Sequence, residues 1–90
     1  MNEQAYRAAA AAKGYGAPEQ KTWAANVFRD PHAHDTDLFL YVQAGAITLH
    51  IAGDPEPRTC RAEDAIEVAA GLAHTEQVGE DGVTFLIASR

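Results

Sequence analysis

A chain of 90 residues with 47% hydrophobic and 22% charged side chains has the composition of one small folded domain, which excludes a disordered chain. Its net charge of −6 argues against nucleic acid and anionic membrane surfaces as partners, because both attract basic proteins. The single cysteine, Cys60, excludes an intrachain disulfide, and no apolar run is long enough to span a bilayer. We therefore expect a cytoplasmic protein.

The N-terminal segment 2–13 predicts a helix. Asn2 is a favourable N-cap residue, and the alanines that follow are strong helix formers. Gly14 ends the helix and opens a cluster of residues that break helices. Because Tyr6 and Ala10 lie on the same helical face, we expect this helix to dock on a sheet.

Beyond residue 18 the hydrophobic periodicity changes to two, which is typical of β-strands. Short strands separated by turn signals indicate an all-β sandwich or small barrel. We expect one domain, in which residues 1–22 form the helix and a linker and residues 23–90 form the barrel. The predicted strands are 21–28, 32–43, 47–51, 58–61, 65–69, 74–78 and 83–88, with turns at 44–45 and 80–82 among others.

Two histidines one residue apart, His32 and His34, precede the apolar run 38–42. In an extended strand alternate side chains point to the same face, so both imidazoles can reach one point in space. Imidazole is the commonest side-chain ligand of transition metals. The pair therefore predicts one half of a metal site.

The other half is expected near residue 74. His74 follows a glycine turn at the start of a predicted strand, and Glu76 shares its face of that strand. A carboxylate inside a barrel is costly unless it is paired or bound to a metal. The chain thus offers three histidines and one carboxylate that can converge.

These residues resemble the two motifs of the cupin family, in particular a small, single-domain cupin of the RmlC-like, conserved-barrel type. In the first motif the two histidines of the pair and the final glycine match, whereas Asn26 stands at the first glycine position and Leu38 at the glutamate position. In the second motif Gly71 and His74 match. Other residues replace the family's glycine, proline and asparagine there, namely Glu63, Ala69 and Val78.

The resemblance covers residues 23–90 and implies a cupin double-stranded β-helix, or jelly-roll, barrel with a short N-terminal helix. It also implies one divalent metal bound by His32, His34 and His74. Three imidazoles suit zinc, iron, nickel, copper or manganese. Because Leu38 occupies the glutamate position, the fourth ligand stays open. Glu76 is either a replacement ligand, a general base or a solvated side chain, and Asp37 is expected to be a turn or rim carboxylate.

Two functions follow from these residues. The first is a metal-dependent enzyme acting on a small organic molecule, with Glu76 as the catalytic residue that moves a proton. The alternative is a non-catalytic small-molecule-binding or regulatory module with a degenerate metal site, and a purely structural domain is a third possibility. A cavity lined by Leu38, Leu40, Val42 and Phe85 would favour a small, partly hydrophobic ligand.

Three further expectations concern residues outside the predicted site. The chain is short and both faces of its central strand are apolar, so we expect a homodimer. His50 lies on the polar face of strand 47–51 and is expected at the surface or at an interface. Cys60 has no activating neighbour in the sequence and is expected to be a packed thiol.

Overall fold

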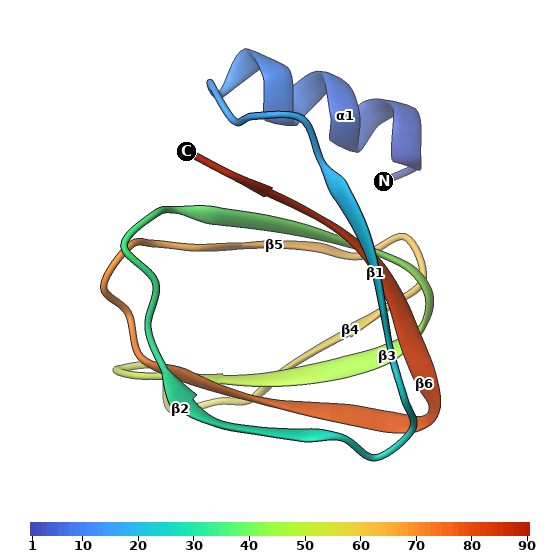
Figure 1. The fold of residues 1–90 in the computed structure, drawn as a ribbon, viewed down its shortest axis with the longest axis vertical. Coiled ribbons are helices and arrows are strands. Elements are labelled where there is room, and N and C mark those ends of the chain that lie inside the picture. Colours follow the sequence, from blue (N-terminus) through green and yellow to red (C-terminus); the bar gives the residue numbers. More distant parts are fainter.

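The computed structural model describes residues 1–90 as one helix and six strands, all paired antiparallel. This confirms the prediction of an all-β fold with a short N-terminal helix. No helix of the structure combines the length and the apolar character that crossing a bilayer requires. In chain order the elements are α1 (Glu3–Ala12), β1 (Glu19–Trp23), β2 (Phe28–His32), β3 (Leu38–Ile51), β4 (Arg58–Arg61), β5 (Ala65–Val68) and β6 (His74–Ser89) (Figure 1).

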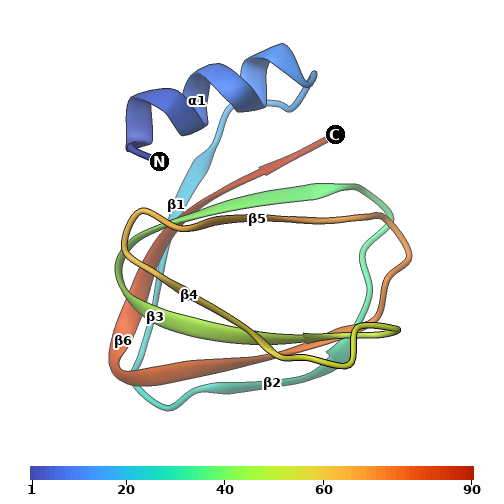
Figure 2. The same ribbon diagram turned by 180° about the vertical axis from the view of Figure 1, so that it is seen from behind.

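The two long strands, β3 and β6, pair with each other along their whole length and bend together into two layers. In one layer, residues 38–41 of β3 pair with β5, and residues 83–87 of β6 pair with β1. In the other layer, residues 46–49 of β3 pair with β4, and residues 74–77 of β6 pair with β2. Figures 1 and 2 show the resulting jelly roll, in which the layers face each other across the core.

The shared bend of β3 and β6 replaces two of the predicted turns. Gly45 and Gly82 both have positive φ, 78° and 76°, and the β3–β6 register shifts on either side of Gly45. The glycines in 44–45 and 80–82 therefore do change the direction of the strands, but the prediction of chain reversals there was wrong. Because each strand meets the same partner on both sides of its glycine, the chain continues as a bent strand.

The predicted strand 21–28 was also wrong in its bounds. β1 begins at Glu19 and ends at Trp23, and a turn at Asn26 with a φ of 62° leads into β2 at Phe28. Asparagine is one of the few residues that adopt this left-handed conformation at low cost. Asn26 thus forms a complete turn that divides the segment into two strands.

The helix covers the outer face of the first layer, as predicted. The side chain of Asn2 caps it by accepting from the backbone N–H of Ala5 at 2.8 Å. Tyr6 and Ala10 are buried against Phe39 and Tyr41 of β3, and the Tyr6 hydroxyl donates to the Phe39 carbonyl at 2.6 Å. The chain's own helix therefore covers the second apolar face of β3, and this face gives no argument for a homodimer.

Two residues outside the predicted site lie as expected. His50 is exposed on the outer side of β3. Cys60 is buried in the core between the layers, and its burial raises the pKa of the thiol. A thiol with a raised pKa is a poor nucleophile at neutral pH, which agrees with a packing role.

The bend generates a first prediction. A Cβ atom on Gly45 would lie 2.0 Å from the carbonyl oxygen of Gly82, whereas a Cβ atom on Gly53, whose φ of 84° is equally left-handed, would meet nothing within 4 Å. We expect Gly53→Ala to lower the free energy of unfolding by about 1–2 kcal/mol through backbone strain. Gly45→Ala should cost about 1–3 kcal/mol more, because the β3–β6 pair must shift. Urea unfolding followed by Trp23 fluorescence measures both, and equal losses would contradict the steric account.

Candidate metal centre

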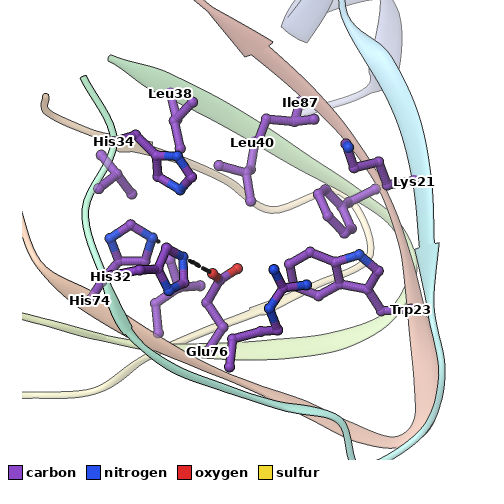
Figure 3. Close-up of a pocket in the computed structure, with 13 residues that line it drawn as sticks. Lys21, Trp23, His32, His34, Leu38, Leu40, His74, Glu76 and Ile87 are labelled. Atoms are coloured by element: carbon purple, nitrogen blue, oxygen red, sulfur yellow. Dashed lines mark ion pairs between the residues drawn. The ribbon is translucent and has the colours of Figure 1, made fainter. Parts of the chain in front are cut away.

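The three predicted histidines lie together on one side of a cavity (Figure 3). His32 ends β2 and pairs in register with His74 at the start of β6. His34 lies in the connection between β2 and β3, so the prediction that one strand carries both His32 and His34 was wrong. The imidazoles nevertheless converge, and one potential ligand atom from each lies within 4.8 Å of the others.

Backbone carbonyls orient two of the imidazoles. His32 Nδ1 lies 2.7 Å from the Asp30 carbonyl oxygen, and His74 Nδ1 lies 3.0 Å from that of Leu72. A carbonyl oxygen can only accept, so each neutral ring carries its proton on Nδ1 and presents the Nε2 lone pair. Metal-binding histidines commonly have one ring nitrogen held in this way, because it fixes both the tautomer and the ring orientation.

A buried carboxylate lies beside the Nε2 atoms of these two rings. Glu76 is only 5% exposed, and its Oε1 lies 2.8 Å from Nε2 of His32 and 3.7 Å from Nε2 of His74. A lone pair that faces a carboxylate oxygen needs a proton or a cation between the two atoms. The three imidazole nitrogens form a donor set that fits a divalent transition metal. The residues present are thus suited to such an ion.

His34 is the most exposed of the three histidines, and its surroundings favour its neutral form. Partial burial lowers the pKa of His34, and the neighbouring His32 and His74 lower this pKa further. A neutral imidazole is the form that binds a metal. The electrostatics at His34 therefore agree with a ligand role.

The histidines and Glu76 open into a cavity of about 190 Å³. About half of its lining residues are apolar, with Leu38, Leu40 and Phe85 in place as predicted, while Val42 belongs to the core instead. The sequence reasoning missed two cations that also line the cavity, Lys21 and Arg29. Lys21 lies two residues before Trp23 in β1. Because residues two apart in a strand share a face, the sequence alone could have placed both side chains on the same face.

Asp37 lies outside the cavity lining, as expected for a turn carboxylate. Its carboxylate accepts from the Ala70 backbone N–H at 2.8 Å and from Arg90 Nε at 2.9 Å. These two partners lower the pKa of Asp37, the Ala70 hydrogen bond most strongly. Asp37 thus ties the connection that carries His34 to the loop before β6 and to the C-terminal residue. Leu38, at the family's glutamate position, lines the cavity.

The contacts of Asp37 predict a pH dependence of stability. A pKa held below its ordinary value of 3.8 contributes stability above that pH, and this contribution is lost as the pH falls through the pKa of the folded state. We expect Asp37→Asn to be less stable than the wild type at pH 7, with the difference narrowing below about pH 4. Urea unfolding midpoints at pH 7, 5 and 3 test this, and a difference that does not change with pH would contradict it.

Solved structures of other proteins share the fold of this chain. No family model matches the chain. No curated protein matches it either. Among solved structures, the chain is similar to the DMSP lyase DddQ from Ruegeria pomeroyi DSS-3, with a TM-score of 0.72 and 20% identity over 79% of this chain and 36% of that one.

Two further structures agree. Oxalate decarboxylase from Bacillus subtilis has a TM-score of 0.70 and 20% identity over 78% of this chain, which spans about a fifth (19%) of that enzyme. The Drosophila melanogaster CENP-C cupin domain has a TM-score of 0.68 and 17% identity over 79% of this chain and 58% of that one. At these identities the likeness shows the fold alone. The jelly-roll topology and these structural likenesses together identify the chain as a small cupin-fold protein.

Proposed function

We propose that this chain is a metal-dependent enzyme that acts on a small organic molecule. The observation that carries the proposal is the meeting of three imidazoles and one buried carboxylate at the end of a cavity. His32, His34 and His74 would hold one divalent transition metal. When bound, the ion would supply Lewis-acid polarisation of a substrate oxygen or of a water molecule.

Glu76 is the proposed catalytic residue. Its carboxylate lies against two of the imidazoles and borders the cavity, so it can accept a proton from a molecule held beside the histidines. With Leu38 at the family's glutamate position, no other carboxylate lines the cavity. Proton transfer at this site therefore falls to Glu76.

The cavity walls support chemistry on a small substrate. Leu38, Leu40 and Phe85 line the space beside the histidines, and apolar walls strengthen electrostatic interactions next to them. The imidazole donor set suits zinc, iron, nickel, copper or manganese. Mn(II) centres occur in the oxalate decarboxylase of Bacillus subtilis.

The second candidate function is a non-catalytic binding module. The substitution of leucine for the family's glutamate at position 38 favours it, because it removes one expected ligand. The fold also occurs in Drosophila CENP-C, for which a structure bound to CAL1 is known. In this alternative the cavity holds a small molecule without transforming it.

We also propose that the protein forms a homodimer in the cytoplasm. The outer strands β4 and β5 each pair on one side only, with β3, which leaves sheet edges that a second copy can cover. The free thiol of Cys60 suits a reducing compartment. Light scattering coupled to size-exclusion chromatography measures the mass of the particle, and a monomer at micromolar concentration would contradict the homodimer.

Removal of one histidine tests the metal centre. We expect the untagged wild type to hold about one equivalent of metal per chain, and His34→Ala to bind it at least about 100-fold more weakly, because a ligand is lost. His50→Ala removes an exposed histidine on the outer side of β3 and serves as the matched control. Elemental analysis after reconstitution measures all three proteins. Equal metal contents in His34→Ala and the wild type, or no metal in any of them, would overturn the proposal.

The role of Glu76 is tested by Glu76→Gln, which keeps the shape of the side chain and removes its charge. We expect the variant to retain the metal while turnover falls by about 10²–10⁴-fold, the usual contribution of a positioned acid or base. The assay uses whichever small oxygen-containing substrate the wild type turns over in a screen. Loss of the metal from Glu76→Gln would assign Glu76 as a ligand, and unchanged turnover would remove it from the mechanism.

A further inference from the structure

The basic side chains of this acidic chain are distributed unevenly. Four of its seven lysines and arginines form ion pairs with carboxylates, namely Arg7 with Glu3, Lys13 with Glu67, Arg58 with Asp54 and Arg90 with Asp37. The side chains of the other three form no ion pair with a carboxylate. Two of these three, Lys21 and Arg29, line the cavity that contains the histidines, and the third, Arg61, lies outside it. Lys21 and Arg29 are both exposed residues, and the same cavity holds one carboxylate, that of Glu76. The two cations therefore outnumber the acidic groups of the cavity, which favours an anionic ligand.

Aromatic packing holds one of these cations in place. The Arg29 guanidinium carbon lies 4.8 Å from the centre of the Trp23 ring, and Trp23 packs edge-on against Phe85 with ring centres 5.0 Å apart. Such a cation–π contact orients the guanidinium plane. An oriented guanidinium binds a carboxylate through two parallel hydrogen bonds with little loss of entropy. Trp23 is therefore a positioning residue for Arg29.

The cavity has two chemically different ends. Figure 3 shows Lys21 and Trp23 across the cavity from His32, His34 and His74. Apolar side chains, those of Leu40, Phe85 and Ile87, line the space together with them. A ligand that uses both ends therefore needs a negative group, a short apolar body and a second group that suits the histidines.

We propose that the ligand is a short-chain organic acid whose carboxylate is bound by Arg29 and Lys21. A second oxygen, from a hydroxyl or carbonyl group, would point toward the histidines. This second contact rests on the proposed metal centre, whereas the carboxylate contact does not. A cavity of about 190 Å³ is smaller than a typical pocket for a drug-sized ligand, so the acid has only a few carbons. An uncharged ligand would displace water from both cations without replacing its hydrogen bonds.

The test uses hydroxy acids and their neutral counterparts. Glycolate, 3-hydroxypropanoate and 4-hydroxybutanoate are titrated into metal-reconstituted protein by calorimetry, together with the three corresponding amides. We expect at least one acid to bind, and its amide to bind at least about tenfold more weakly. Arg29→Met and Lys21→Met should each weaken binding of that acid by about tenfold or more and leave binding of its amide unchanged.

A charge-matched control separates a local contact from the effect of net charge. Arg61→Met removes the third unpaired cation, which lies outside the cavity, and should leave the affinity for the acid unchanged. Arg29→Lys keeps the charge but removes the two-pronged donor, so we expect a loss smaller than that of Arg29→Met. Circular dichroism verifies that each variant is folded.

The outcomes distinguish this inference from the metal proposal, because elemental analysis is run on the same samples. Equal affinity for acid and amide, an equal effect of Arg61→Met, or no binding of any acid in the series would overturn the carboxylate site. If the protein holds no metal but binds an acid in an Arg29-dependent way, the carboxylate site stands and the metal centre fails. If the protein binds metal but does not discriminate between acid and amide, the metal centre stands and the carboxylate site fails.

Discussion

The close approach of two glycines allows the rest of this small structure to form. The backbone of Gly82 on β6 leaves no room for a Cβ atom on Gly45 of β3, and both glycines adopt left-handed backbone conformations. The two strands therefore bend together while they continue to pair, and each contributes to both layers. The two layers can enclose a cavity only because these strands cross between them.

The bend also brings the chemistry of the cavity together. His74 and Glu76 lie at the beginning of β6, in the layer that contains β2, while Leu38 and Leu40 lie at the beginning of β3, in the opposite layer. Residues that lie far apart in the sequence thus face one cavity. The outer face of β3 does not line the cavity, because Tyr6 and Ala10 of α1 cover it. One face of β3 therefore lines the cavity, and the other face packs against the helix.

Periodicity and local chemistry were sufficient to predict the elements and part of the site. The alternation of Ile47 and Leu49 with polar residues predicted the second half of β3 correctly, and Asn2 with the alanine run predicted α1. The three histidines were predicted to converge, and they do, because the geometry of a β2–β6 pair brings His32 opposite His74. A resemblance carried by a few residues was enough for the fold.

The remaining features depend on tertiary contacts that the pattern of residues along the sequence does not reveal. A glycine with positive φ is compatible with both a hairpin and a bent strand, and only the continued pairing with β6 decides for the bend at Gly45. His34 reaches its neighbours from a connection, where strand parity does not apply. The contact of Arg29 with Trp23 joins residues of two strands separated by a turn at Asn26, where the sequence pattern predicted one continuous strand.

The irregular pairing of β2 has a consequence for local dynamics. β2 contacts β6 through a register that shifts between Arg29 and His32, and Pro31 within it has no N–H to donate. Such an edge is expected to open more readily than the core, on its own and without global unfolding. An ion held between His32 and His74 would clamp the irregular end of β2 to β6. Amide exchange in β2 would then report the occupancy of the centre, while the amides of α1, on the opposite side of the first layer, would be insensitive to it.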